Sequence, residues 1–192
     1  MAYLILGLLL FLGVHSTRIV ADSWRTRVRA RVGEQAFKVI YSVLSLGGFL
    51  LIIWGFGIAR EAPTLLWLPP NGLRHAAALL NVLAFVLIAA AYVPGNAIKA
   101  RLRHPMVLGT KTWALAHLIA NGNLAHVVLF GAFLLWAVLD FISLRQRDRA
   151  QGIQYPAGTA SATVLTVVIG VGIAAVFAFW LHGLLIGVKP FG

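Results

Sequence analysis

The sequence predicts an all-α, polytopic membrane protein: a transmembrane helical bundle with about five membrane-spanning helices. Of its 192 residues, 60% are hydrophobic and only 11% are charged, and the mean hydropathy is +0.89. A soluble domain carries about 25% charged residues, so this composition excludes a soluble enzyme and a disordered chain. A membrane span needs about 20 apolar residues. The stretches without Asp, Glu, Lys or Arg that reach this length are Val39–Ala59, His75–Ile98, Thr112–Leu139 and Ala150–Val188.

The first three spans follow from apolar runs and the loops that bound them. The run Ala2–Val14 lacks the basic start and the small-residue cleavage site of a signal peptide, so we expect an uncleaved span that continues to about Val20. The second span is expected over Phe37–Ala59 and the third over Leu73–Val93. The loop between them, Arg60–Gly72, contains Trp and several prolines, which is typical of a segment at the membrane interface.

The fourth span is expected to start after His104-Pro105 and to continue to Leu139, although Asn121-Gly122-Asn123 falls near its middle. A helical hairpin broken at these residues would give six crossings. Twenty-eight uncharged residues reach only about 42 Å as a helix, which favours one crossing. The fifth span is expected over Ala162–Val188. The sequence shows no internal repeat and no segment of different composition that would indicate a second domain. Residues 1–192 are therefore interpreted as a single transmembrane domain.

The distribution of 16 basic against 5 acidic residues predicts the orientation. Basic residues concentrate in cytoplasmic loops of membrane proteins. In the five-span arrangement, eleven of them share one side: Arg18, Arg25, Arg27, Arg29, Arg31, Lys38, Lys99, Arg101, Arg103, Lys111 and Lys189. We therefore expect a multi-pass membrane protein with the N-terminus outside and the C-terminus cytoplasmic. The group Arg145–Arg149 lies on the opposite side and contradicts the rule.

The positions of the basic residues also indicate which partners the protein contacts. They lie in short loops between apolar runs, where they set topology and contact anionic lipid headgroups, so the lipid bilayer is the expected partner and nucleic acid is not. The absence of cysteine excludes disulfides, thiolate ligands and iron–sulfur clusters. The five acidic residues fall in loops or at span ends, which disfavours a di-iron carboxylate site and a paired-carboxylate hydrolase.

Histidines inside the spans are the candidate site residues, because ionisable side chains in a membrane usually mark function. His15, His117 and His182 lie three to seven residues from a basic residue, so we expect them one to two helical turns from the cytoplasmic face. His126 is nine residues beyond His117, deeper and on the opposite helix face. Two neutral imidazoles from different helices at one depth suit an axially ligated haem; a neutral imidazole bonded between helices is the alternative.

Four ordered motifs resemble the NnrU family of bacterial integral membrane proteins across essentially the whole chain. They are Gly13-Val-His15-Ser-Thr-Arg18, Phe37-Lys-Val-Ile-Tyr41-Ser-Val-Leu-Ser45-Leu-Gly-Gly48, His104-Pro-Met-Val-Leu-Gly109 and Trp113-Ala-Leu-Ala-His117-Leu-Ile-Ala-Asn121-Gly122. The resemblance implies a place in the bacterial cytoplasmic (inner) membrane and an association with nitrite and nitric oxide metabolism in denitrification. The plant relative of this family is the zeta-carotene isomerase, a haem b membrane enzyme whose ligand histidines lie in two of these motifs.

Carried over to this chain, the resemblance implies haem b with His15 and His117 as the iron ligands. Arg18 is expected to pair with a propionate, while Gly13 and Ala114 leave room for the macrocycle. Asn121, one turn after His117, is expected either to orient it or to form a hydrogen bond between helices. His182 is the third candidate ligand. If the protein is an enzyme, we expect a haem-dependent cis–trans isomerase or a redox enzyme, with an apolar lipid-like or isoprenoid substrate; the sequence identifies no redox partner.

Two functions other than haem binding stay open as alternatives: a methyltransferase and a membrane helper protein. Arg103-His104-Pro105 also resembles the start of a signature in membrane lipid and isoprenylcysteine methyltransferases, which use S-adenosylmethionine. Those enzymes carry an acidic pair downstream, whereas only Asp140 and Asp148 follow the motif here. The same residues can simply end a loop and start a helix, since Pro suits a first helical turn. The other alternative is a membrane helper protein without a cofactor.

Overall fold

The structure is a computed structural model, and it describes residues 1–190. Its elements in chain order are α1 (Ala2–Val20), α2 (Asp22–Val32), α3 (Glu34–Ala59), α4 (Asn71–Tyr92), α5 (Ala97–Leu102), α6 (Pro105–Ala120), α7 (Leu124–Ala150), α8 (Ala160–Val176), the π-helical turn η1 (Phe177–Leu181) and α9 (His182–Ile186). Within residues 1–190, five long apolar helices are able to span a membrane: α1, α3, α4, α7, and α8 continued through α9. The all-α bundle with about five such helices is thereby confirmed.

The chain forms two compact units, and each is described by itself. Unit 1 consists of residues 1–68 and 121–140, and unit 2 consists of residues 69–120 and those from 141 onwards. Helix α7 begins in unit 1 and ends in unit 2.

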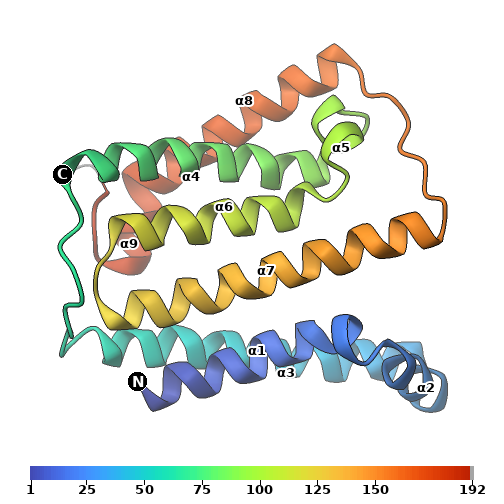
Figure 1. Cartoon of the computed structure of the whole chain (residues 1–192), viewed down its shortest axis with the longest axis horizontal. Helices are drawn as coiled ribbons and strands as arrows, with labels where there is room; N and C mark the ends of the chain where they lie inside the picture. The colour runs from blue at the N-terminus through green and yellow to red at the C-terminus, as the bar shows by residue number, and fades with distance from the viewer. Residues whose placement is uncertain (191–192) are drawn as a thin grey trace. The chain divides into compact units, whose positions relative to one another are not determined.

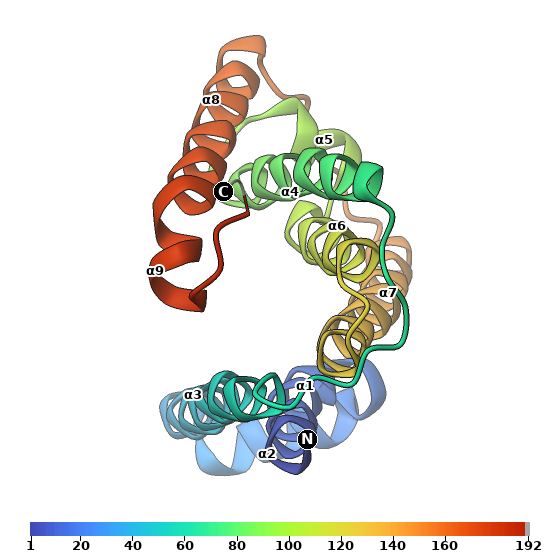
Figure 2. The same ribbon diagram turned by 90° about the vertical axis from the view of Figure 1, so that its left-hand side faces the viewer.

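Unit 1 is built on the packing of α1 against α3, which lie side by side in Figure 2. Glycines allow this close approach. A Cβ atom at Gly48 would lie 2.7 Å from the backbone nitrogen of Phe11, and one at Gly7 would lie 2.6 Å from that of Ile52. Leu4 and Leu8 of α1 are buried in the contact. Small residues let helix backbones approach within a membrane, where van der Waals packing drives association.

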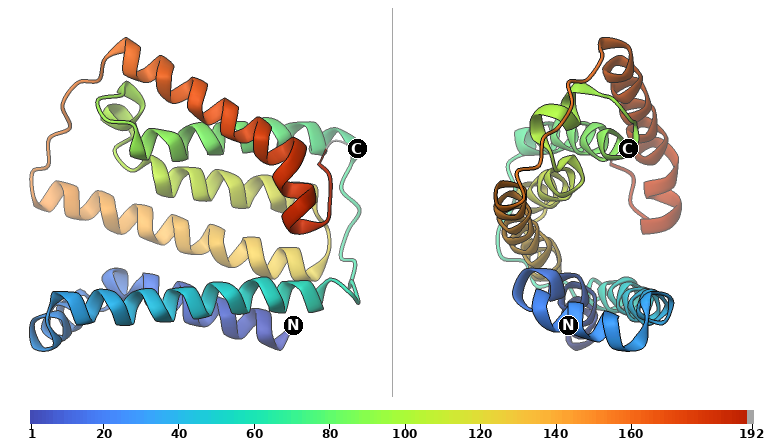
Figure 3. Two further views of the ribbon diagram at one scale, coloured as in Figure 1. Left: turned by 180° about the vertical axis from the view of Figure 1, so that it is seen from behind. Right: turned by 90° about the vertical axis from the view of Figure 1, so that its right-hand side faces the viewer.

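Unit 2 is built on α4, which packs against α6 on one side and α8 on another (Figures 1 and 3). A Cβ atom at Gly109 of α6 would lie 2.9 Å from the Ala84 carbonyl oxygen, and one at Gly170 of α8 would lie 2.5 Å from the Val86 Cα. The helices therefore meet through backbone surfaces rather than long side chains, as in other small-residue membrane contacts.

The prediction of one continuous fourth span is wrong. The chain leaves the helix at residues 121–123, between α6 and α7. The backbone groups there bond instead to the loop after α3: the Gly122 carbonyl accepts hydrogen bonds from the N–H groups of Leu66 and Trp67, and the Leu124 N–H donates to the Thr64 carbonyl. A Cβ at Gly122 would collide with the Trp67 carbonyl, so this contact requires glycine.

The second half of the expected span is also longer than its uncharged stretch suggested. Helix α7 continues past Leu139 to Ala150 and includes the basic residues of the Arg145–Arg149 group. Helix α6 starts at Pro105, which confirms the interpretation of His104-Pro105 as a helix start. The two helices together have far more length than the 28 residues on which the single-span argument rested.

Candidate functional site

His15 lies in unit 1 within an aromatic environment. Its ring centroid is 4.2 Å from that of Phe11, 5.3 Å from that of Tyr41 and 6.1 Å from that of Trp136. Its Nδ1 lies 2.7 Å from the Phe11 carbonyl oxygen, one helical turn earlier. Because a carbonyl only accepts, Nδ1 carries the proton and donates it. The lone pair of the neutral ring is therefore on Nε2.

His117 lies in unit 2 and repeats this local arrangement. Its Nδ1 is 2.9 Å from the Trp113 carbonyl oxygen, again one turn earlier, and the rings of the two residues are 5.3 Å apart. The same argument assigns the proton to Nδ1 and the lone pair to Nε2. Metal-bound histidines commonly donate the N–H of their other nitrogen in this way, which fixes the tautomer and the ring orientation. The tautomer and the fixed ring orientation of both histidines therefore suit a ligand of a haem iron.

Unit 1 also holds a polar atom that the fold leaves unsatisfied. Among the described residues, the indole Nε1 of Trp136, which packs on His15, is buried without a hydrogen-bond partner. A buried donor without an acceptor destabilises a fold by about 1–3 kcal/mol. This donor beside His15 is available to an acceptor on a group that the protein itself does not supply.

The remaining intramembrane histidines differ from this pair. His126 packs on Phe56 at 5.1 Å between ring centroids, and within the described residues its buried Nδ1 has no hydrogen-bond partner, unlike the Nδ1 atoms of His15 and His117. His182 follows the π-helical turn η1, and its exposed Nδ1 donates to the Val188 carbonyl at 2.6 Å. His182 therefore shares the tautomer of the candidate ligands but lies in a more exposed setting.

The helix limits revise the expected depth of His117. It lies twelve residues after Pro105, about 18 Å along the helix, and only three residues before α6 ends. The expected one to two turns were counted from Lys111; counted from Pro105, where the helix starts, His117 lies in the second half of α6. His15 lies five residues before α1 ends, as expected. The reason for the difference is that α6 starts well before the uncharged stretch.

The other expected site residues are placed as follows. Arg18 Nε lies 4.0 Å from Asp22 Oδ1, with half of each side chain exposed. Asn121 lies one residue beyond the end of α6, outside the helix on which it was expected to face His117. A Cβ at Gly13 would meet open space, whereas Ala114 is fully buried and offers no surface to a macrocycle.

A polar cluster in unit 2 was missed at the sequence level. His104 Nε2 lies 2.9 Å from Asp148 Oδ2, and the Tyr155 hydroxyl donates to the same oxygen at 3.1 Å. The side chains of His104 and Asp148 are 13% and 9% exposed. One signal could have found the pair: Asp148 is the only acidic residue within the sequence of unit 2.

Among the described residues, no group of three or more His, Cys, Asp or Glu side chains could hold a metal ion. A haem iron with two axial imidazoles takes four of its ligands from the porphyrin, so it requires no such group. The geometry therefore defines a polytopic α-helical membrane protein whose candidate metal ligands are separate, locally oriented histidines.

The comparison with protein families agrees with this class. A family model described as "NnrU protein" matches residues 3–190, so the chain belongs to the NnrU family. No match was found among the curated proteins or among the solved structures. The match covers nearly all of residues 1–192; whether they form a single domain stays a prediction.

Proposed function

We propose that this NnrU-family protein binds haem b, with His15 and His117 as the residues that would hold its iron. The observation that supports it most is the shared Nδ1–H···O=C bond of these two histidines, at 2.7 Å and 2.9 Å, which leaves the lone pair on Nε2 in both. The proposal of a shared iron rests on their two motifs, which match the ligand motifs of the haem-containing relative. When bound, haem would supply one-electron chemistry and a binding site for nitric oxide.

The protein's own residues would perform three tasks at such a site. The Phe11 and Trp113 carbonyls hold the two imidazole rings in one tautomer. The rings of Phe11 and Tyr41 exclude water around His15. The unsatisfied Trp136 indole offers a hydrogen bond to an acceptor that enters the site. A redox or nitric-oxide-linked role, or a redox-controlled isomerisation of an apolar substrate, is the function that this arrangement supports best.

The test is the absorption spectrum of protein expressed with ample haem and purified in detergent, oxidised and then reduced with dithionite. We expect a stoichiometric six-coordinate, low-spin haem. His15→Ala and His117→Ala should each give a five-coordinate, high-spin spectrum or lose haem, and the double variant should bind none. His126→Ala is the matched control and should keep the wild-type spectrum.

Two results would refute the proposal. Wild-type protein purified without haem would refute the proposed function. Unchanged spectra in both single variants and the double variant would refute the assignment of His15 and His117 as ligands. Size-exclusion profiles and thermal melting of each variant show whether a lost spectrum reflects misfolding. Imidazole added to a folded alanine variant should restore the low-spin spectrum only where an axial ligand was removed.

We further propose a membrane topology with six crossings in the bacterial cytoplasmic membrane, in which α6 crosses as well. Within unit 2, α6 packs along α4, a candidate span: Gly109, near the start of α6, lies against Ala84 and Ile88, near the end of α4, and α6 returns toward the start of α4 (Figure 1). The start of α6 meets the end of α7, through His104 with Asp148 and through Lys111 Nζ, 5.3 Å from the Phe141 ring centroid. At these contacts, all within unit 2, α6 and the last turns of α7 therefore run in opposite directions.

This topology removes the conflict in the charge distribution. The ends at Arg18–Lys38, Lys99–Lys111 and Arg145–Arg149 share one side, and they hold thirteen of the 16 basic residues. Arg60, Arg74 and Lys189 remain on the other side. The positive-inside rule then places the N-terminal end and the segment after α9 both outside, in place of the cytoplasmic C-terminus that five crossings imply.

A further inference from the structure

One end of unit 2 gathers the loops that join α4 to α5 and α7 to α8. The Thr159 N–H donates to the Gly95 carbonyl at 2.8 Å, and the Ala97 N–H donates to the Thr163 hydroxyl at 2.9 Å. Gly158 makes this contact possible, because a Cβ there would collide with the backbone at Asn96 and Ala97. The loop after α7 is therefore held against α5 by backbone contacts.

An open pocket of about 310 Å³ lies between these segments. We call it the basic pocket; its lining residues are Ala97, Ala100, Arg101, Tyr155, Ala157 and Gly158. A second guanidinium adjoins it, since Arg103 Cζ lies 5.8 Å from the Tyr155 ring centroid. The walls are otherwise alanine and glycine, so the guanidinium of Arg101 and the Tyr155 ring dominate the chemistry of the pocket.

The charge at this end of the unit is strongly positive. Lys99, Arg101 and Arg103 lie on or directly after α5, and Arg145, Arg147 and Arg149 lie on the last turns of α7. Asp148, the only carboxylate in the sequence of unit 2, is buried and bonded to His104 and Tyr155. It contributes one negative charge against these six basic side chains, so this end of unit 2 stays positive and an anion from outside the protein is the complementary partner.

We propose that the basic pocket binds the phosphate group of an anionic phospholipid headgroup. Arginine suits this role because its planar fork of N–H donors binds phosphate oxygens in pairs. Basic pockets between membrane helices on the cytoplasmic side are typical headgroup sites. Inorganic phosphate shares the same chemistry, and the experiment distinguishes the two sources.

Position in the membrane favours a lipid over a free ion. The pocket lies at the end of α4 and the start of α8, two of the candidate spans, where headgroups meet the acyl region. Next to it, these helices expose apolar side chains: Tyr92 is 74% exposed and Val164 is 62% exposed. A phospholipid would place its phosphate in the pocket and its chains along these residues. A free phosphate would interact only with the positive charge of the basic pocket and would not contact these apolar residues.

The test is native mass spectrometry of the full-length protein released from nanodiscs of phosphatidylglycerol and phosphatidylcholine in equal amounts. Wild type should retain phosphatidylglycerol selectively. Arg101→Gln should reduce its retention roughly ten-fold, the effect of one charge-assisted hydrogen bond. Arg149→Gln is the matched control, because it removes the same charge from the same end of unit 2 without lining the pocket. It should retain phosphatidylglycerol as wild type does.

A second variant tests the space in the basic pocket independently of its charge. Ala100→Leu fills the space with all arginines intact, and it should also reduce phosphatidylglycerol retention while phosphatidylcholine retention is unchanged. Equal losses for Arg101→Gln and Arg149→Gln would show attraction to general surface charge and overturn the proposal. Retention by Ala100→Leu at the wild-type level, or competition by inorganic phosphate without lipid selectivity, would overturn it as well. Thermal melting of each variant in detergent identifies one that fails to fold.

Discussion

The imidazole Nε2 of His104 lies 2.9 Å from the carboxylate Oδ2 of Asp148, and this contact joins the start of α6 to the end of α7. The two residues are 44 positions apart in sequence. Both side chains are largely buried, and Tyr155 donates to the same carboxylate oxygen. A polar group removed from water requires its hydrogen-bond partner, so the pair is expected to stabilise this end of unit 2.

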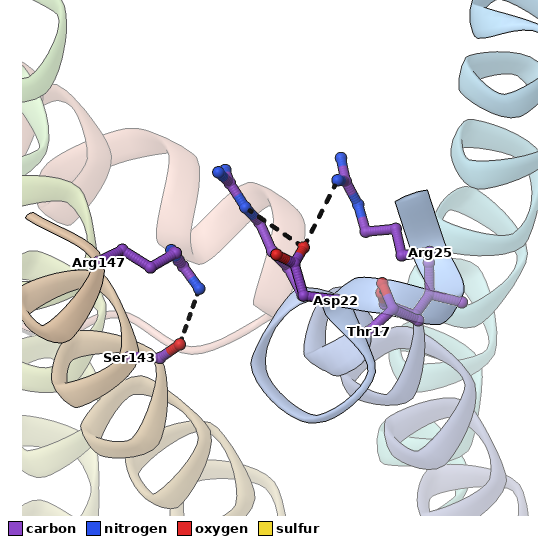
Figure 4. A network of polar contacts seen from close by, with 7 residues as sticks. Thr17, Asp22, Arg25, Ser143 and Arg147 are labelled. Atoms are coloured by element: carbon purple, nitrogen blue, oxygen red, sulfur yellow. Dashed lines mark hydrogen bonds and ion pairs between the residues drawn. The ribbon is translucent and has the colours of Figure 1, made fainter. Parts of the chain in front are cut away.

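Removing Asp148 tests that role. Asp148→Ala leaves His104 and Tyr155 without their acceptor, and we expect a loss of about 1–3 kcal/mol in the free energy of unfolding. Thermal unfolding in detergent measures the change. The control is Asp22→Ala, because Asp22 is half exposed and its arginine contacts are 4.0 Å long, as drawn for Arg25 in Figure 4. Such surface pairs contribute about 0–1 kcal/mol. Equal shifts in the two variants would contradict a stabilising role for the buried pair.

The titration of Tyr155 reports on the same cluster. Burial, with a hydrogen bond to Asp148 and its negative charge, raises the pKa of the Tyr155 hydroxyl above its ordinary value of 10.0. Because the folded pKa lies above the unfolded one, this stabilisation is complete below pH 10 and is lost as the pH rises through the folded pKa.

Phenolate absorbance of wild type minus that of Tyr155→Phe isolates this group. We expect a difference curve with its midpoint above 10.0, and a lower midpoint in the Asp148→Asn background, where the negative charge is removed. A midpoint at or below the ordinary value would show that the hydroxyl does not bond to Asp148.

Reporter fusions decide between five and six crossings. Fusions after Gly33 and Arg103 should report a cytoplasmic position, and a fusion after Asn71 an external one, in both arrangements. The fusion after Gln151 discriminates, because six crossings place it in the cytoplasm and five place it outside. We expect the cytoplasmic result, since α6 and α7 run in opposite directions at the His104–Asp148 contact. An external result would restore the five-crossing topology.

Neighbouring glycines on α3 provide a matched pair for the α1–α3 contact. Gly48→Ala places a methyl group 2.7 Å from the Phe11 nitrogen, so the helices must separate; overpacking of this kind destabilises by about 1–3 kcal/mol. Gly47→Ala meets nothing within 4 Å and should be neutral or stabilising by up to about 1 kcal/mol. Thermal melting of both variants measures the difference, and equal melting temperatures would rule out a close α1–α3 approach at Gly48.

His182 is the remaining candidate ligand, and its variant has a defined expectation. His182→Ala should keep a bound, low-spin haem, because the exposed ring bonds to Val188 near the end of the chain and lies outside the two motifs. The spectrum used for the ligand variants measures it. Loss of the low-spin signal in folded His182→Ala, with His15→Ala unchanged, would transfer the second ligand from His15 to His182.

Composition and hydropathy alone determined the class of this protein. The apolar stretches of 20 residues or more predict helices because the bilayer admits only segments that satisfy their own backbone hydrogen bonds. That is why α1, α3, α4 and α8 lie close to their predicted positions. The histidines were found for a similar reason, since an ionisable residue within an apolar run is visible in any single sequence. Four ordered motifs identified the family, which residues 3–190 match.

Only the tertiary structure decided where the fourth span breaks and what its ends contact. The helix stops at residues 121–123 because the Gly122 carbonyl and the Leu124 N–H find partners in the loop after α3, more than 50 residues earlier. The pairing of His104 with Asp148 and the tautomer of His15 and His117 likewise depend on which atoms lie within hydrogen-bond distance. A local pattern reports burial and periodicity, whereas these contacts arise from packing between segments distant in sequence or from the placement of single atoms.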